Sequence, residues 1–245
     1  MSVSGGRGVW QYTLQNMMLK TTALFAISLL ITVSSLNPII ASEPSDENRI
    51  LAVVKKMEST FKALQDYTCE VEQVFYREGV EDQRCRFKFY FKKDHKIRVD
   101  FFAPYPSLTI LYGGGEKEAT VIPLRFFPAM RFHFSIDNPR LRTIAGQRID
   151  QTDMGYFIEF LLRNLEKVRQ KEDEFHDEGD QIKFVLWAND YIGGKNLEKY
   201  QVSVTKKHWL PIRIERYSSE GLLLEITDIR NYEIDAHLED KLFTP

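Results

Sequence analysis

The sequence predicts a mainly β domain with helices, an α+β fold built on a long antiparallel sheet. Apolar and polar residues alternate with a period of two over residues 67–124 and again over 182–230, as in strands that bury one face. Two apolar stripes with helical spacing precede and interrupt these segments. Aromatic residues make up 13% of the chain, with 17 Phe and 11 Tyr, which are residue types that strands favour.

A signal peptide is expected at the N-terminus. An apolar run over residues 23–33 follows Lys20, and its length is typical of a signal-peptide core but short for a membrane span. Small residues follow at Ala41 and Ser42. We therefore expect an exported protein, with residues 1–41 removed by cleavage near Ala41.

The remaining residues, 42–245, are expected to form a single domain. Met17 or Met18 would give the signal peptide a compact start, and a retained membrane anchor is the alternative to cleavage. The net charge of the chain is −2, so no basic surplus indicates a nucleic-acid partner.

A helix is expected over residues 46–65. Ser45 is a suitable N-cap, and acidic residues follow it at the positive end of the helix dipole. Apolar residues recur at spacings of four and three along one face, which are Ile50, Val54, Met57, Phe61 and Leu64.

Residues 67–124 are expected to form a meander of neighbouring antiparallel strands. Residues 77–82 resemble a turn, and the strand after it is the most clearly amphipathic in the chain. Its apolar face carries Cys85, Phe87, Phe89 and Phe91. The next strand continues this face with Ile97, Val99 and Phe101.

The second half repeats the pattern of a helix followed by strands. After an irregular stretch over residues 125–141, a helix is expected over 153–170, with an apolar face wider than a simple stripe. Residues 171–180 resemble a charged linker. The strands expected after it cover residues 182–187, 197–205, 211–217 and 222–230.

No catalytic or metal-binding motif is recognisable, and we expect neither an enzyme nor a cofactor. No two of the five His residues are three or four positions apart, as a helical metal pair requires. The G-x-S-x-G motif of serine hydrolases is absent. Gly113-Gly114-Gly115 lies between two expected strands, so it indicates a hairpin turn. An exported hydrolase built on scattered acidic residues or on Cys69 and Cys85 remains the enzymatic rival.

Cys69 and Cys85 are a possible disulfide, because they lie on neighbouring strands in an oxidising compartment. Direct pairing would centre the hairpin on Arg77, whereas the turn-like residues centre nearer Gly79 or Val80. A β-bulge would restore the alignment. The alternative is two buried thiols.

Apolar surface is the remaining feature that suggests a function. The strand wall and the wide helix face either close on each other as an ordinary core or line a cavity for an acyl chain or apolar peptide. The candidate lining residues are Phe87, Phe89, Phe91, Ile97, Val99, Phe101, Phe157, Ile158, Leu161 and Leu165.

The order of elements resembles the LolA-like superfamily of periplasmic outer-membrane lipoprotein carriers. Three stretches are similar to the family: residues 67–74, residues 91–101 with Pro104 after them, and residues 210–232 with 238–243. The opening Asp66-Tyr-Thr-Cys69 is also similar to an uncharacterised exported branch of the superfamily.

This resemblance implies a curved antiparallel sheet, an incomplete β-barrel with an N-terminal helix and a helical lid formed by 153–170. It implies a cavity that shelters acyl chains during lipoprotein sorting and outer-membrane biogenesis. The family's functional Arg falls on Lys93, the candidate lid latch, although Lys lacks the planar guanidinium fork.

The implied partners are a lipid or acylated lipoprotein and a membrane-bound loading or receiving protein, with the chain itself a monomer. A regulatory or interaction module with a filled cavity is the alternative.

Overall fold

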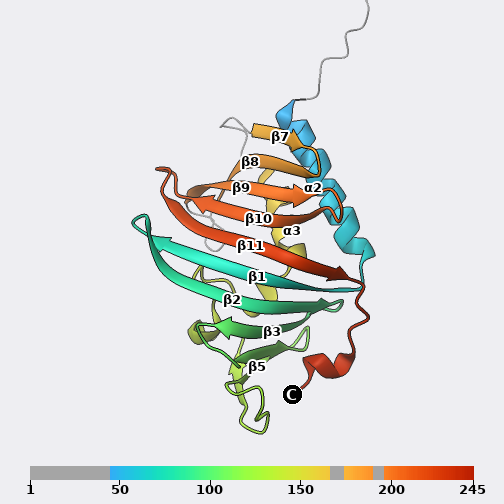
Figure 1. Ribbon diagram of the computed structural model, residues 1–245, viewed down its shortest axis with the longest axis vertical. Coiled ribbons are helices and arrows are strands. Elements are labelled where there is room, and N and C mark those ends of the chain that lie inside the picture. Colours follow the sequence, from blue (N-terminus) through green and yellow to red (C-terminus); the bar gives the residue numbers. More distant parts are fainter. Residues whose placement is uncertain (1–44, 166–173, 190–195) are drawn as a thin grey trace, which may run out of the picture. The chain divides into compact units, whose positions relative to one another are not determined.

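One antiparallel sheet organises the computed structural model, which describes residues 45–165, 174–189 and 196–245. Its eleven strands lie in the order β6-β5-β4-β3-β2-β1-β11-β10-β9-β8-β7 (Figure 1). They are β1 (Asp66–Arg77), β2 (Val80–Lys92), β3 (Lys96–Ala103), β4 (Thr109–Tyr112), β5 (Glu118–Ile122), β6 (Phe132–Ser135), β7 (Glu174–Glu178), β8 (Gln181–Asn189), β9 (Leu197–Thr205), β10 (Leu210–Tyr217) and β11 (Leu223–Ile234). Among the described residues β6 and β7 remain edge strands, so the sheet is open. The α+β fold and the long antiparallel sheet predicted from the sequence are confirmed.

The sheet consists of two meanders joined along one seam. Strands β1 to β6 pair in sequence order, and so do β7 to β11. The first strand, β1, pairs antiparallel with the last strand, β11, in register from Val71↔Ile229 to Phe75↔Glu225. Each half of the sheet is therefore a continuous stretch of chain.

Two helices in the described residues lie on the same face of the sheet. Helix α2 (Asp46–Ala63) begins as expected, because the Ser45 hydroxyl accepts a hydrogen bond from the Asn48 N–H at 3.4 Å. Helix α3 (Met154–Leu165) packs against α2 and β8. Figure 1 shows α3 behind the strands, with α2 crossing beside the ends of β7 to β10.

Gly155 sets the close approach of the two helices. A side-chain carbon at this position would lie 2.4 Å from a ring carbon of Phe61 on α2. Because glycine has no side chain, the Phe61 ring can pack directly on the first turn of α3.

Buried apolar side chains form two cores on this face. The first core lies under the helices and comprises Ile50, Val53, Val54, Met57, Phe157, Ile158, Phe160, Leu161, Leu165, Ile182, Phe184, Leu186, Ala188, Tyr200, Val202 and Val204. The second core is centred on β1 to β3 and comprises Leu64, Tyr67, Cys69, Val71, Phe89, Phe91, Ile97, Val99, Tyr112, Ala119, Ile136, Ile149, Met154, Leu210 and Ile229.

An irregular segment between β6 and α3 packs on the second core. It contains two short 3₁₀ helices, η1 (Pro139–Leu141) and η2 (Ile149–Gln151). Between them the Thr143 N–H donates to the Gln147 carbonyl at 2.9 Å, and the Gly146 N–H donates to the Thr143 carbonyl at 2.7 Å. A third 3₁₀ helix, η3 (Asp240–Phe243), follows the last strand.

Two expectations about local structure were wrong. The predicted charged linker over 171–180 contains strand β7, whose largely exposed side chains explain the lack of an apolar pattern. The predicted turn over 77–82 is shorter, because β2 begins at Val80. Glu78 and Gly79 form the turn at positive φ, 54° and 79°, as a two-residue hairpin requires.

Some expectations fall outside the described residues. These are the signal peptide over 1–41 with its start and cleavage positions, and residues 166–170 of the predicted second helix.

Candidate functional site

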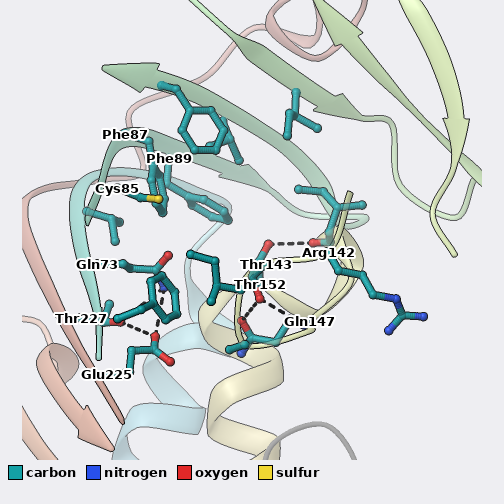
Figure 2. Close-up of a pocket in the computed structure, with 18 of the residues that line it drawn as sticks. Gln73, Cys85, Phe87, Phe89, Arg142, Thr143, Gln147, Thr152, Glu225 and Thr227 are labelled. Carbon is teal, nitrogen blue, oxygen red and sulfur yellow. Dashed lines mark hydrogen bonds between the residues drawn. The ribbon is translucent and has the colours of Figure 1, made fainter. Parts of the chain in front are cut away.

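A cavity of about 280 Å³ lies across the β1–β11 seam, on the face of the sheet that carries the helices. Its walls come from β1 to β4, β9 to β11, the segment between β6 and α3, and the first turn of α3. Figure 2 shows the side chains of β2 on one side and residues such as Arg142, Thr143 and Gln147 on the other.

Five of the candidate lining residues surround this cavity. They are Phe87, Phe89, Val99, Phe101 and Phe157. The alternation of β2 and β3 brings the first four to one face, and the pairs Phe87↔Phe101 and Phe89↔Val99 lie directly opposite each other. The rings of Phe87 and Phe101 are 5.4 Å apart, so these strands give the cavity a continuous aromatic wall.

The other five candidates lie in the cores and do not line the cavity. Phe91 and Ile97 belong to the second core, at 2% and 0% exposure. Ile158, Leu161 and Leu165 belong to the first core, where α3 packs on α2 and β8. The apolar stripe of α3 therefore fills the space over one half of the sheet, and only its first turn reaches the cavity.

The cavity wall opposite the aromatic side chains is the irregular segment rather than a helix. Residues 140–145 line it together with Gln147, Ile149 and Thr152. The guanidinium of Arg148 anchors the segment by ion pairs with Asp150 and Asp137, at 2.5 Å and 3.1 Å. No role could be predicted for this stretch, because its sequence has no regular apolar period.

A buried polar cluster forms one end of the cavity. Arg216 lies between two carboxylates, 3.1 Å from Glu225 and 3.4 Å from Glu198. The Tyr200 hydroxyl donates to Glu198 at 2.8 Å. Gln73 and Thr227 donate to the remaining oxygen of Glu225, at 3.4 Å and 2.9 Å (Figure 2). This cluster was missed, since single charges on alternate strand positions look like an exposed face.

Burial governs the electrostatics of this cluster. Burial raises the pKa of the Glu225 carboxyl, and the neighbouring Arg216 only partly opposes the rise. Burial also disfavours the charge on Arg216, but Glu225 and Glu198 outweigh it and the pKa of Arg216 is raised. The Arg216 Nε has no hydrogen-bond partner among the described residues. The cavity thus has an apolar body and one polar end.

The start of α3 lies beside the cavity and is fixed by Asp153. One Asp153 carboxylate oxygen accepts from the N–H groups of Gly155 and Tyr156, at 2.7 Å and 3.2 Å. The other oxygen is buried and lies 3.4 Å from His95 Nδ1. Burial raises the pKa of Asp153, against these hydrogen bonds and His95.

Lys93, the latch candidate, lies near the end of the other helix. Its ammonium donates to the Lys62 carbonyl in α2 at 2.8 Å, and its N–H donates to the Gln65 carbonyl at 2.9 Å. The contact from this turn to the start of α3 is made by His95 instead.

Both cysteines are free thiols that line the cavity. Cys69 pairs with Phe89 and Cys85 pairs with Gln73 across the hairpin, so the sulfurs lie out of register, as the turn at Gly79 requires. The bulge between Phe75 and Tyr76 lies on the turn side of both residues and does not realign them. Burial raises the pKa of both thiols.

Two further observations concern the described residues. Within residues 45–165, 174–189 and 196–245, no three His, Cys, Asp or Glu side chains are grouped to hold a metal ion. In the same part of the chain no helix is both long and apolar enough to cross a membrane.

The chain is similar in structure to proteins of the LolA superfamily. A LolA superfamily protein from Nitrosomonas europaea has 14% identity and a TM-score of 0.40 over 80% of this chain and 97% of that one. The Mycobacterium tuberculosis lipoprotein LppX has 8% identity and a TM-score of 0.47 over 78% and 98%. MucB in the Pseudomonas aeruginosa MucA/MucB complex has 12% identity and a TM-score of 0.40 over 82% and 62%.

The resemblance expected from the sequence thus has its counterpart among solved structures. This likeness is one of fold and carries nothing about ligand or partner. No family model matches the sequence, and no curated protein matches it either.

Proposed function

We propose that this chain is an exported periplasmic binding protein whose cavity shelters an acyl chain, in the sorting or transport of lipoproteins to the outer membrane. The observation that carries the proposal is the apolar cavity of about 280 Å³ with its aromatic wall on β2 and β3. Small-molecule sites span roughly 300–1,000 Å³, so the cavity in this conformation is close to the lower end of that range.

The energetics of an acyl chain explain why such a site is useful. Each buried methylene contributes about 0.8 kcal/mol, so a long chain carries on the order of 10 kcal/mol. A molecule with that much apolar surface stays in a membrane unless a protein cavity replaces the lipid. The aromatic wall offers this replacement without catalytic groups, and we propose a non-enzymatic role.

The moving cover of the cavity is, in this proposal, the segment over residues 139–153. Opening α3 instead would expose Ile158, Leu161 and Leu165, which are at most 8% exposed. At about 1.5–3 kcal/mol for each side chain, this would use much of the roughly 5–15 kcal/mol that stabilises a typical domain. The irregular segment has fewer buried apolar side chains and moves at lower cost.

Native mass spectrometry of the protein purified from its own periplasm, followed by lipid extraction, tests the proposal. We expect a co-purifying acylated molecule that is lost in Phe101→Ser, because Phe101 is half-buried in the cavity wall. Phe175→Ser is the matched control, since Phe175 is also half-buried but packs against the first core.

Two results would contradict the proposal. One is a protein without bound lipid that also ignores added fatty acid and acylated peptide. The other is equal lipid loss in both variants, which would indicate general destabilisation. The first result would favour the alternative of an interaction module with a protein partner, and pull-down from the periplasm would then be the next experiment.

A further inference from the structure

The segment from Leu124 to Phe132 exposes an unusual amount of apolar surface. Of the ten large apolar side chains that are exposed among the described residues, five lie in this 124–132 loop. They are Leu124, Phe126, Phe127, Met130 and Phe132, with exposures of 36%, 77%, 52%, 42% and 50%. Pro128 and Ala129 between them are exposed as well. Contiguous exposed apolar surface of this kind marks an interaction site.

The loop is an ordered projection. The Phe127 N–H donates to the Leu124 carbonyl at 2.8 Å, and the Met130 N–H donates to the Phe127 carbonyl at 3.1 Å, which makes two successive turns. Figure 1 shows the chain after β5 reaching beyond the strands at the bottom of the view. The aromatic side chains are therefore held on the outside of the molecule at the edge of the sheet.

The loop adjoins the rim of the cavity. The Arg125 N–H donates to the Ser107 carbonyl at 2.8 Å, and the Arg125 guanidinium donates to the Phe101 carbonyl at 3.1 Å. Between these two anchor points in sequence lies Tyr105, which lines the cavity yet is 59% exposed. A surface that binds the loop would thus lie next to the cavity rim.

The 124–132 loop itself carries two Arg residues and no carboxylate, although the chain as a whole is acidic. Residues 123–136 contain Arg125, Arg131 and His133 but neither Asp nor Glu, whereas the net charge of the chain is −2. Arg125 lies 3.7 Å from Asp100. Arg131 makes no ion pair with any of the residues that the structure describes, so its charge is free to meet an external anion.

We propose that the 124–132 loop docks the protein on a bilayer that contains anionic phospholipid. Its aromatic side chains would enter the boundary between headgroups and acyl chains, and Arg131 would pair with the lipid phosphates. Such docking would place the cavity rim at the level of the headgroups. This inference concerns a separate surface and does not rest on what the cavity holds.

A bilayer fits the loop better than a protein partner because of the chemistry of the exposed side chains. Protein interfaces carry about one hydrogen bond per 100–200 Å², whereas apart from two Arg residues every side chain of the 124–132 loop is apolar. The boundary between headgroups and acyl chains accepts apolar side chains without directed hydrogen bonds.

Vesicle co-sedimentation tests the proposal, using a chain that begins at Ser42. This chain retains the compact unit over residues 44–245 and lacks the apolar run at the N-terminus, which would itself bind lipid. The vesicles are phosphatidylcholine alone or phosphatidylcholine with phosphatidylglycerol at about 3:1. We expect binding to the anionic vesicles, weakening as salt screens the charges.

Substitutions then locate the contact. Phe126→Ser with Phe127→Ser should weaken binding at least about tenfold, and Arg131→Ala about fivefold. Val80→Ser and Leu222→Ser are matched controls, because these side chains are 69% and 48% exposed but lie outside the loop. They should bind as the parent does. Phe126→Trp should shift its fluorescence to the blue on vesicles and be quenched by brominated lipid.

Three outcomes would overturn the proposal. Equal binding of the parent and the loop variants would place the contact elsewhere, and an unchanged Phe126→Trp emission would exclude insertion. A dimer that light scattering detects in the parent but not in Phe126→Ser with Phe127→Ser would assign the loop to a second copy of the chain. Phe101→Ser should lose acyl ligand but keep vesicle binding, so failure of one proposal is distinguishable from failure of the other.

Discussion

The two halves of the sheet differ in what covers them. Over β8 to β10, the helices α2 and α3 supply regular apolar stripes, and the first core has side chains such as Ile50, Leu161 and Phe184 at 0% exposure. Over β1 to β4, the cover is the irregular segment between β6 and α3, and a cavity remains beneath it. Similar strands therefore give a filled core or a hollow one, depending on the element that packs against them.

The presence of the cavity therefore depends on the element that packs against the strands, not on the strands themselves. Strands β2 and β3 present an aromatic face as apolar as that of β8 and β9. The facing segment carries Arg142, Thr143 and Gln147, each of which makes a hydrogen bond within the segment. Such residues cannot interdigitate with aromatic rings as a helix stripe does, so space is left.

The largest expected effect is a difference in the free energy of unfolding between a substitution in the first core and one beside the cavity. Leu161→Ala removes a fully buried side chain from the first core and should cost about 2–5 kcal/mol of the free energy of unfolding. Phe101→Ala beside the cavity should cost less, about 1–2 kcal/mol, because the Phe101 side chain is only partly buried. Urea denaturation measures both, and equal losses would mean that the two halves are equally well packed.

A second effect concerns the boundary between the halves, where Asp153 caps α3. Asp153→Ala removes the acceptor for the N–H groups of Gly155 and Tyr156 and should cost about 1–2 kcal/mol. Asp153→Asn keeps an acceptor oxygen and serves as the control. If both variants unfold at the parent's urea concentration, the cap contributes nothing to stability.

A third effect is a pH dependence at the polar end of the cavity. Because burial raises the pKa of folded Glu225, its stabilising contribution is complete below the unfolded pKa of about 4.5 and is lost as pH rises through the folded pKa. Glu225→Gln removes this loss, so its free energy of unfolding should fall less steeply than the parent's over that pH range. Parallel curves from urea titrations at several pH values would contradict this assignment.

The smallest effect is one of reactivity. Cys85 lines the cavity and is 8% exposed, whereas Cys69 is 0% exposed and deeper in the wall. N-ethylmaleimide should label Cys85 before Cys69, because Cys85 is the more exposed of the two. Both reactions should be slow, because burial raises the pKa of both thiols. Added fatty acid should slow the labelling further. Peptide mapping by mass spectrometry distinguishes the two cysteines. Faster labelling of Cys69 would mean that the reagent reaches the cavity by a route other than past Cys85.

The strands and helices could be predicted because their side chains repeat with a regular period. The alternation from Cys85 to Phe101 located the cavity wall, and the stripe from Met154 to Leu165 located α3. The sequence could not show which half of the sheet α3 covers, since Ile158 and Leu161 would suit either face. Only the packing of α3 on α2 and β8 decides that they fill a core.

The rest of the site depends on contacts between residues far apart in the chain. In the sequence, Glu225 and Arg216 are isolated charges. The pairing of β9, β10 and β11 brings them beside Glu198. The segment over residues 139–153 has no period because 3₁₀ turns and ion pairs hold it. Strand β7 was missed because Glu174, His176 and Glu178 are exposed, which leaves almost no apolar signal in its sequence.

The pairing of the first strand with the last has a consequence for the order of folding. Each meander joins strands that are neighbours in sequence, so each can form through short loops, whereas Gln73 and Glu225 on the seam are 152 residues apart. Closing so long a loop carries a large entropic cost and is slow. We expect the β1–β11 seam to form late. The polar end of the cavity, which Gln73, Glu225 and Thr227 build across that seam, would then be complete only in the finished fold.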